Sequence, residues 1–493
     1  MITALLACVA TMSVAHRPNV VLIYIDDLGY GDVTLNGAQS GLTPNVDRLA
    51  SQGLTFTDAH CSAATCTPSR YTLLTGQYAF RKKGTGVAPG DANMIIDPGT
   101  MTIASALKQA GYTTGVVGKW HLGLGEGPID WNGLITPGPE SIGFNYHFLI
   151  PATGDRVPTV FVEQGRVVNL DPSDPIRVSY KERIDESPSG KERPDLLKMG
   201  LTQGHDQTIV NGISRIGWMT GGQSARWVDE DIADTLTRKA VSFIDKNKGG
   251  PFFLYFATQD IHVPRAPNKR FVGKSGMGPR GDAIVEMDWI VGQVLKTLDK
   301  DGLTDKTLVI FTSDNGPVLD DGYADQANEL LGAHKPAGPF RAGKYSRFEG
   351  GTRVPMIVRW PGFVKPGTTT DALFGQVDIS RTLADLAGVK TSAQELPDSR
   401  DALAALIGKP ALGREYLVEE AGALSIRVGD WKYILPGSTS DGLGPWTRVQ
   451  FGKSGALYDV RIDPGETTDV AAQHPDVVAR LRALIEDVKA NIR

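Results

Sequence analysis

The stretch that decides the fold is Asn19–Ile25, NVVLIYI, which is followed at once by Asp26 and Asp27. A short apolar run without polar alternation is typical of a parallel strand buried on both faces. Two adjacent carboxylates at the end of such a strand repel each other and are costly to desolvate. A divalent cation with oxygen ligands removes that cost. The plain alternative is a solvated turn, since Asp and Gly favour turns.

Predicted helices and strands alternate outward from this stretch. A helix is predicted over Pro44–Gln52, with Thr43 as its N-cap and Gly53 after its end, and a second over Thr102–Ala110. Further strands are predicted at Gly115–Gly118, Phe252–Ala257, Thr307–Thr312 and Pro355–Arg359, and long helices at Asp231–Lys246 and Asp282–Leu298. This alternation favours an α/β fold with a large mixed, mostly parallel sheet sandwiched by helices.

Two regions depart from the alternation. The segment from Ile150 to about Arg226 is rich in Pro, Gly and charge, and an insertion of this size is usually functional, so we expect it to shape the substrate site. The loop Pro317–Gly338 is also polar. After residue 387, short predicted strands and a final helix at Pro475–Ile492 indicate a smaller C-terminal subdomain of antiparallel sheet plus helix. We therefore predict a catalytic domain over 16–387 and a subdomain over 388–493.

Charge and cysteine usage exclude some classes of protein. Lys and Arg number 51 against 56 Asp and Glu, a formal net charge of −5, so no basic excess indicates nucleic-acid binding. Three cysteines cannot build a disulfide framework for 493 residues, although spacing alone leaves a Cys61–Cys66 bridge open. Met1–Ala15 is apolar or small throughout and too short to span a membrane. It resembles a secretory signal without a positive start, and no other stretch approaches a membrane span.

A second polar cluster, Thr312-Ser313-Asp314-Asn315-Gly316, follows another strong apolar strand. Ligands of open α/β sheets bind beyond the carboxyl ends of the strands. Two oxygen-rich clusters at strand ends of one sheet can therefore converge on one cation. Ligand type alone does not separate calcium from magnesium.

The third cluster is Cys66-Thr67-Pro68-Ser69-Arg70, followed by YTLLTG. Pro68 can start a helix, which places residue 66 near a helix N-terminus, where an oxyanion is favoured. The motif resembles the signature of the formylglycine-dependent (type I) sulfatases, C-x-P-x-R followed by x-x-L-L-T-G. In that family a dedicated enzyme oxidises the cysteine to an aldehyde, whose hydrate supplies the nucleophile. The alternative interpretation of Cys66 is a buried cysteine without a chemical role.

The resemblance extends over nearly the whole chain in family order. Matching blocks are NVVLIYIDDLGYG (19–31), TPNVDRL (43–49), GYTTGVVGKWHLG (111–123), PFFLYFATQDIH (251–262), LVIFTSDNG (308–316), RAGKYSRFEGGTRVP (341–355), RVGDWKYI (427–434) and LYDVRIDPGE (457–466). One short motif can occur by chance, whereas an ordered set is specific. It implies the alkaline phosphatase-like fold and a sulfuric ester hydrolase.

Site residues carry over position by position. The resemblance implies that calcium is bound by Asp26, Asp27, Asp314, Asn315 and the modified Cys66. It implies that Lys119 and His121 of GKWHLG hold the sulfate and the nucleophile, and that His121 deprotonates the gem-diol when sulfate leaves. A sulfate monoester is an anion, so its attacker needs a cationic pocket, to which calcium and Arg70 contribute.

Two further residues match family positions near the leaving group. His262 of QDIH matches the residue that contacts the bridging oxygen, and we expect it to protonate the sugar alkoxide. Lys344 of RAGKYS matches a sulfate-binding lysine. Thr153 in PATGD matches a hydroxyl ligand, and Asp155 and Arg156 beside it are candidates to contact sugar hydroxyls or an acidic sugar.

The blocks GPFRAGKYSRFEGG and GDAIVEMDW resemble sulfatases of galactose- or N-acetylgalactosamine-6-sulfate. With the signal-like start, they indicate a bacterial periplasmic or secreted enzyme of sulfated glycan degradation, whose partners are the sulfated carbohydrate and a formylglycine-generating or anaerobic sulfatase-maturating enzyme. Two alternatives remain: a formylglycine-dependent phosphonate or phosphodiester hydrolase, and an inactive glycan-binding relative. The second usually lacks a nucleophile, metal ligand or Lys–His pair, and this chain lacks none of them.

Overall fold

The computed structural model describes residues 17–39, 41–409 and 413–491. The expected leader, Met1–Ala15, lies outside these residues. A ten-stranded sheet forms the centre, in the order β17-β2-β16-β14-β1-β13-β4-β5-β6-β7. Five neighbouring strands run parallel: β14 (Thr307–Ser313), β1 (Asn19–Ile25), β13 (Phe252–Ala257), β4 (Thr113–Lys119) and β5 (Tyr146–Ile150). The outer strands are β16 (Met356–Arg359), β2 (Leu54–Phe56), β17 (Thr368–Thr370), β6 (Val162–Glu163) and β7 (Arg166–Val167).

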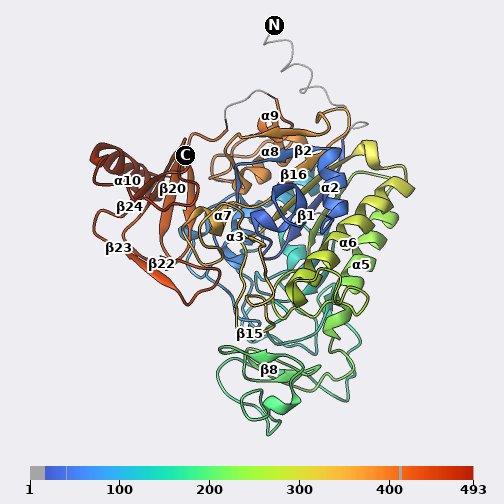
Figure 1. Cartoon of the computed structure of the whole chain (residues 1–493). Helices are drawn as coiled ribbons and strands as arrows, with labels where there is room; N and C mark the ends of the chain where they lie inside the picture. The colour runs from blue at the N-terminus through green and yellow to red at the C-terminus, as the bar shows by residue number, and fades with distance from the viewer. Residues whose placement is uncertain (1–16, 40, 410–412, 492–493) are drawn as a thin grey trace.

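Helices cover both faces of this sheet (Figure 1). One face carries α2 (Pro44–Ser51), α5 (Ile232–Asn247) and α6 (Gly278–Lys300), and the other carries α3 (Cys66–Thr75), α4 (Ile103–Gln109) and α8 (Ile379–Leu386). Strand β1 explains the arrangement, because Val20, Leu22 and Tyr24 pack in one core while Val21 and Ile23 pack in the other. The predicted mixed, mostly parallel sheet between helices is confirmed.

Element boundaries differ from the predictions where local patterns are weak. Strand β5 was not predicted, because the apolar run YHFLI directly precedes the polar insertion. Strand β2 is three residues long, too short to show a period. Helix α6 begins at Gly278 rather than Asp282, with Pro279 in its first turn, where proline is tolerated. Thr102 caps α4 from outside and accepts a hydrogen bond from the backbone N–H of Ser105.

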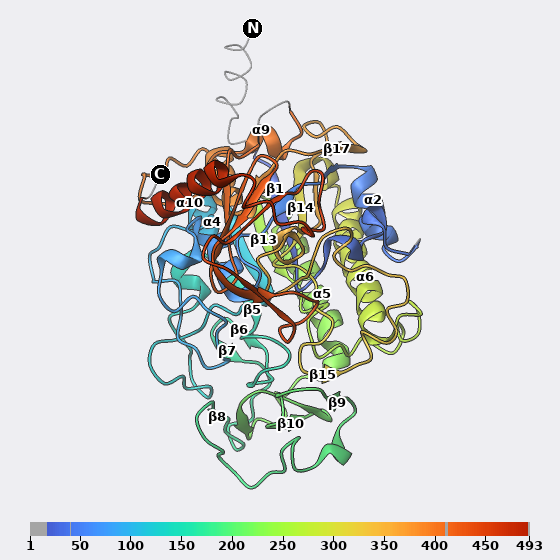
Figure 2. The same ribbon diagram turned by 60° about the vertical axis from the view of Figure 1, so that its left-hand side comes forward.

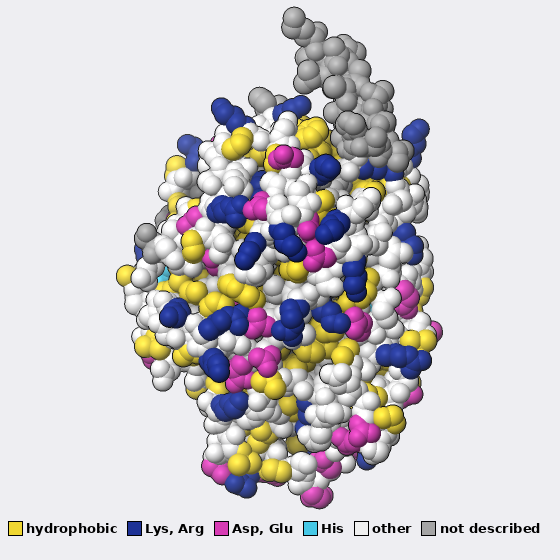
Figure 3. All heavy atoms as spheres, turned by 90° about the vertical axis from the view of Figure 1, so that its right-hand side faces the viewer, with side chains coloured by type: hydrophobic (Ala, Val, Ile, Leu, Met, Phe, Trp, Pro, Cys, Tyr) yellow, Lys and Arg dark blue, Asp and Glu magenta, His cyan; other side chains and the backbone are white. Residues whose placement is uncertain are grey.

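The insertion after Ile150 folds into short paired strands at the lower end of the molecule (Figures 1 and 2). They are β8 (Arg177–Ser179), β9 (Gly200–Leu201), β10 (Ile209–Val210), β11 (Ile213–Ser214) and β12 (Trp218–Thr220), with β15 (Tyr323–Ala324) paired to β9. Figure 3 shows the molecule from the α5 and α6 side, where Lys and Arg side chains are interspersed with Asp and Glu. In the described part of the chain, no helix is both long and apolar enough to cross a bilayer.

The C-terminal part forms a separate antiparallel sheet. Its strands are β19 (Leu417–Glu420), β20 (Leu424–Val428), β21 (Trp431–Ile434) and β24 (Ala456–Asp459), and helix α10 (Pro475–Ala490) packs on them. Shorter elements are β3 (Ala59–His60), α7 (Glu349–Thr352), β18 (Phe374–Gly375), α9 (Leu403–Leu406), β22 (Gly437–Ser440) and β23 (Arg448–Phe451). The antiparallel sheet with one helix agrees with the sequence, while the division of the chain after residue 387 stays a prediction.

A buried network of charges joins this subdomain to the main sheet. His60 contacts Asp58 through Nε2 and Glu419 through Nδ1, both at 2.8 Å. Glu349 forms ion pairs with Arg427 at 2.6 Å and with Lys432 at 3.1 Å. Both imidazole nitrogens of His60 contact carboxylates, and Arg427 and Lys432 pair with Glu349. The negative charges of the acids are therefore balanced by side chains of the protein itself. We therefore interpret this cluster as structural.

Acid should weaken this network through Asp58. Burial opposes its charge, but His60 and Arg427 outweigh burial and lower its pKa from 3.8 to about 2. Its contribution is therefore present above pH 3.8 and is lost as the pH falls towards 2, a difference of about 2 kcal/mol. We predict that the stability gap between the parent and Asp58→Asn, measured by urea unfolding, narrows over this range. A gap that is constant with pH would contradict the assignment.

Candidate active site

Functional side chains gather where four parallel strands end. Asp26 and Asp27 follow β1, Lys119 is the last residue of β4, His262 lies in the loop after β13, and Asp314 follows β14. The parallel register places these ends at one edge of the sheet, since β1 pairs with both β13 and β14. All five side chains are buried. The predicted convergence of the strand-end clusters is therefore observed.

The acidic residues contact one another across the strands. The backbone N–H of Asp27 donates to Asp314 Oδ1 at 3.2 Å, and Asn315 Nδ2 donates to Asp27 Oδ1 at 2.7 Å. Asp27 has a φ of +60°, an uncommon conformation for a residue other than glycine. This turn brings its carboxylate towards Asn315, and strain of this kind clusters at functional sites.

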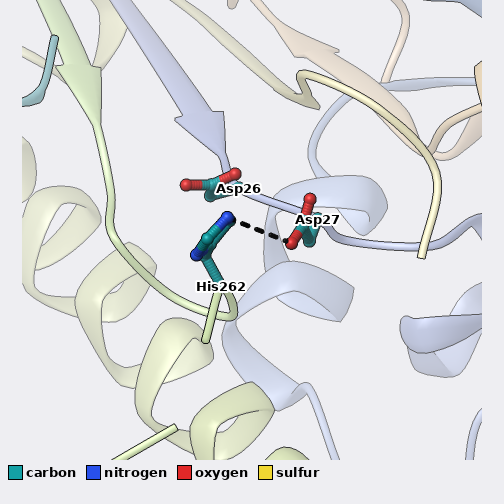
Figure 4. Close-up of side chains that lie close together, drawn as sticks. All are labelled: Asp26, Asp27 and His262. Carbon is teal, nitrogen blue, oxygen red and sulfur yellow. Dashed lines mark ion pairs between the residues drawn. The ribbon is translucent and has the colours of Figure 1, made fainter. Parts of the chain in front are cut away.

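The donor set fits a hard divalent cation. Asp26 Oδ1 and Asn315 Oδ1 are buried and have no hydrogen-bond partner among the described residues. Burial, followed by the neighbouring Asp314 carboxylate, raises the pKa of Asp26 well above its ordinary value, so the cluster is short of positive charge. Oxygen ligands from carboxylates and an amide suit calcium or magnesium. Figure 4 shows His262 pointing towards Asp26 and Asp27, but its nitrogen is not a ligand that hard cations prefer.

Cys66 is the first residue of α3 and is 2% exposed. Burial raises the pKa of its thiol, and the lowering effects of Lys119 and Lys344 do not offset it. The thiol is therefore poorly suited to act directly as a thiolate nucleophile. Cys61 and Cys66 are both free, so the disulfide left open by their spacing does not form.

Arg70, one turn along α3, is anchored by the acids. Its Nη2 and Nε donate to Asp314 Oδ2 at 2.7 and 3.0 Å, and its Nη2 lies 3.8 Å from Asp26 Oδ2. Its Nη1 donates to the carbonyl oxygen of Lys119 at 3.2 Å. Lys119 Nζ itself contacts Asp26 Oδ2. This arrangement fixes two cations against the acidic cluster, beside the start of the helix that carries Cys66.

His121 has one ring nitrogen free for proton transfer. Its Nε2 lies 2.8 Å from the carbonyl oxygen of Ala88, which can only accept, so Nε2 carries the hydrogen. Its Nδ1 is buried without a partner among the described residues. Burial, then Lys119 and Arg156, lower the pKa of His121 well below its usual range. His121 is therefore a neutral imidazole whose Nδ1 lone pair can accept a proton.

His262 and Lys344 flank Asp27 from two loops. His262 Nδ1 donates to the carbonyl oxygen of Val263 at 2.6 Å, and its Nε2 lies 3.8 Å from Asp27 Oδ2. Lys344 Nζ donates to Asp27 Oδ2 at 2.9 Å and to Asp321 Oδ2 at 3.0 Å. Asp321 comes from the predicted loop 317–338, where no motif or periodicity distinguishes it from the other polar residues.

A second polar group lies where the insertion meets the sheet. Thr153 and Asp155 are hydrogen-bonded side chains, and Arg156 Nη1 donates to Asp155 Oδ2 at 2.7 Å. His205, from the far part of the insertion, places Nε2 3.0 Å from Asp155 Oδ2. Burial opposes the charge of His205, but Asp155 raises its pKa. Sequence reasoning missed His205, whose only local signal is a polar Gly–His turn in a segment without periodicity.

Comparisons with known proteins agree with this geometry. The sulfatase family profile matches residues 18–139 and 173–389. An N-acetylgalactosamine-6-O-sulfatase of Bacteroides thetaiotaomicron is 54% identical over 480 residues, covering 96% of this chain and 94% of that protein. Human arylsulfatase A is 32% identical over 507 residues, covering 97% and 89%. A solved Bacteroides thetaiotaomicron structure, from work on a locus for the metabolism of multiple glycosaminoglycans, superposes with a TM-score of 0.92 at 53% identity, covering 97% and 100%.

With the acidic cluster, the lysines and these relatives in place, the chain belongs to the sulfatase family. It is a sulfuric ester hydrolase with the fold of that family.

Proposed function

We propose that this sulfatase removes 6-O-sulfate from N-acetylgalactosamine or galactose at the end of a sulfated glycan, with a calcium ion and a formylglycine made from Cys66. The observation that carries the proposal is the buried convergence of oxygen donors and cations around Cys66 at one sheet edge. The 54% identity to an N-acetylgalactosamine-6-O-sulfatase supports the sugar. The leader and a periplasmic or secreted location stay predictions, as do the domain limits.

The oxygen donors assigned to calcium are Asp26, Asp27, Asp314 and Asn315, together with the modified residue 66. A calcium ion bound by these donors would supply Lewis-acid stabilisation to the sulfate, and a hydrated formylglycine at position 66 would supply the attacking hydroxyl. Two cations of the protein pair with the proposed ligands, since Arg70 contacts Asp314 and Lys119 contacts Asp26. These ion pairs fix the two carboxylates in position. A maturation enzyme has to oxidise Cys66 before its side chain is buried in the folded protein, where it is 2% exposed.

The lysines bind the sulfate oxygens. Lys119 and Lys344 both lie close enough to Cys66 to lower the pKa of its thiol, so both can act on an anion bound there. Their ammonium groups, fixed by Asp26 and Asp27, are preorganised for an anion that gains charge in the transition state. Arg70 contributes to sulfate binding indirectly, because it positions the carboxylates of Asp314 and Asp26.

Two histidines move protons in opposite directions. The tautomer of His121 leaves Nδ1 able to accept a proton, which would be the one that the hydrated formylglycine gives up when sulfate leaves. His262 gives a proton to the bridging oxygen from Nε2, since Nδ1 is held by Val263. Burial and the two lysines lower the pKa of His262. Its proton is therefore retained only when an anionic ester occupies the site and offsets the charge of the lysines.

The sugar hydroxyls are bound by the group at the start of the insertion. Asp155 accepts hydrogen bonds, while Arg156 and His205 donate, and Thr153 can do either. Asp155 keeps its charge because Arg156 and His205 outweigh its burial and hold its pKa well below the usual range. An ionised acceptor between two donors can discriminate the orientation of one hydroxyl on the ring.

The direct test is sulfate release from a panel of sulfated sugars by the matured protein. We expect turnover of N-acetylgalactosamine-6-sulfate or galactose-6-sulfate and little turnover of 4-sulfated isomers. A phosphodiester substrate in the same assay tests the alternative phosphodiester hydrolase. The substrate assignment is wrong if another sulfated sugar turns over while both 6-sulfates stay intact.

His205→Ala is predicted to impair sugar recognition. Removing one partner of the ionised Asp155 should lower kcat/KM for the 6-sulfated sugar about 10- to 100-fold, while an aryl sulfate without hydroxyls is affected far less. The matched control is His474→Ala in the C-terminal subdomain, which should change neither substrate. An equal loss on both substrates would contradict a role in sugar recognition.

Metal removal is predicted to abolish turnover and to lower the melting temperature. Without the cation, Asp26 and Asp314 repel each other in a buried site. Chelator-treated protein should regain both properties with calcium. Activity should saturate once the metal concentration exceeds the dissociation constant, and the melting temperature should then rise with the logarithm of that concentration. Recovery with magnesium but not with calcium would show that the other hard cation occupies the site. A chelator-treated protein with unchanged melting would contradict a metal in this cluster.

A further inference from the structure

The insertion contains a second pocket, apart from the candidate active site. It has a volume of about 290 Å³, and its lining side chains come from β12 and from loops within residues 185–226 of the insertion. The paired strands of the insertion lie at the lower end of Figure 1. Its lining includes the apolar side chains of Trp218 and Leu196 and the polar side chains of Asp185, Gln223 and Arg226. Leu196 is 43% exposed although it is a large apolar side chain.

This composition suits a sugar ring. A pyranose has an apolar C–H face and a rim of hydroxyls, so it needs an aromatic or aliphatic wall opposite planar hydrogen-bonding groups. Trp218 is half-buried and has Arg183 over its ring, 5.4 Å from the ring centroid. The Asp185 carboxylate and the exposed Gln223 amide face the same pocket.

Arg226 adds a charge preference. Its Nε and Nη2 donate to the carbonyl oxygen of Gly221 at 3.1 and 2.8 Å. In the part of the chain that the structure describes, no carboxylate lies within ion-pair distance of it. Burial lowers the pKa of Arg226, and the more distant carboxylates of Asp174 and Asp185 offset this only in part. A half-buried guanidinium without a direct ion-pair partner favours an incoming carboxylate or sulfate, which it can bind through two parallel hydrogen bonds. Arg183 differs, because it is paired with Glu192 at 2.8 Å.

The pocket is directly connected to the candidate active site by one backbone segment. The N–H of Ile216 donates to the carbonyl oxygen of Asp155 at 2.8 Å, and the N–H of Val157 donates to the carbonyl oxygen of Ile216 at 3.1 Å. Trp218 is two residues further along the same chain segment. The pocket and the proposed sugar-binding group at Asp155 therefore belong to adjoining parts of one hydrogen-bonded segment.

We propose that this pocket is a second glycan-binding site, which holds an acidic sugar of a polymeric substrate through Trp218 and Arg226. This inference rests on the proposed function, because it assumes that the natural substrate is a sulfated glycan. The acidic group is either a uronate carboxylate or a sulfate, and the chemistry at Arg226 is the same for both.

Calorimetry on the full-length Cys66→Ala variant tests binding without turnover. The probes are an unsulfated oligosaccharide of alternating glucuronic acid and N-acetylgalactosamine, its sulfated counterpart, and a neutral N-acetylglucosamine oligosaccharide. We expect the acidic probes to bind, and Arg226→Gln or Gln223→Ala to weaken that binding, by about ten-fold for Arg226→Gln. Binding by the unsulfated probe identifies the carboxylate, and binding by only the sulfated probe identifies the sulfate. Equal binding of the neutral probe, or unchanged binding by Arg226→Gln, would overturn the proposal.

Kinetic measurements on the matured enzyme are the second test of the proposed glycan-binding pocket. Arg226→Gln should lower the ratio of kcat/KM for the sulfated polymer to that for the sulfated monosaccharide about ten-fold. The matched control Arg238→Gln, on an exposed face of α5, should leave the ratio unchanged. An unchanged ratio in Arg226→Gln would contradict the pocket. Absence of sulfate release from every sugar would contradict the proposed function, while the calorimetry would still decide the pocket.

Discussion

The Cys66→Ala variant is expected to fold like the parent protein and to release no measurable sulfate, a loss of at least about 10⁴-fold even after exposure to the maturation enzyme. The reason is that alanine cannot be oxidised to the aldehyde, so the attacking hydroxyl is absent. Removing one buried sulfur costs only about 1 kcal/mol of stability. Sulfate release and thermal unfolding should be measured on the same preparation.

Cys61→Ala is the matched control for this variant. Cys61 is also a buried, free cysteine, and it lies five residues before Cys66. Its thiol contacts the carbonyl oxygens of Ala63 and Thr352 rather than the acidic cluster. Cys61→Ala should keep its activity. If Cys66→Ala retained turnover above one hundredth of the parent, the nucleophile would have to lie elsewhere.

Arg70→Gln is expected to lose both activity and stability. Arg70 is fully buried and pairs with Asp314 at 2.7 Å, so its removal leaves a buried carboxylate without its partner. Breaking such a pair costs about 3–5 kcal/mol. The displaced carboxylate also perturbs the proposed calcium ligands, so kcat should fall by at least about 10²-fold. Urea unfolding and initial rates below the melting temperature measure the two effects.

Arg414→Gln separates the chemical effect from the structural one. Arg414 also forms a buried ion pair, with Asp378 at 2.7 Å, but this pair lies away from the acidic cluster. Its variant should lose stability while the folded fraction keeps its kcat. If Arg70→Gln behaved in the same way, with normal kcat in the folded protein, then Arg70 would not support the reaction centre.

Much of the fold could be predicted because the strands that carry the site are strongly patterned. The uninterrupted apolar run at Asn19–Ile25 required a strand buried on both faces, and the structure places it between two parallel neighbours. The acids that follow β1 and β14 could be placed together, since parallel strands end at the same edge. The roles of Lys119, His121 and Lys344 came from the family resemblance and stay proposals.

The insertion could not be predicted in the same detail. His205 and Asp155 are fifty residues apart in the sequence, and their 3.0 Å contact depends on two-residue strands and turns without a period. His205 in the insertion and Gln326 in the loop 317–338 both have positive φ values. Neither histidine nor glutamine marks such a turn as glycine would, so the turns cannot be recognised from the local sequence. The pocket at Trp218 likewise forms only when the insertion has folded, because its lining residues range from Asp185 to Arg226.

The most direct test of the account is the mass of the tryptic peptide Leu49–Arg70 from a preparation that releases sulfate. This peptide contains both Cys61 and Cys66. We expect an intact thiol at Cys61 and, at position 66, the mass loss of a thiol-to-aldehyde conversion with a carbonyl that reacts with hydrazides. An active preparation in which Cys66 carries an unmodified thiol throughout would contradict the formylglycine mechanism.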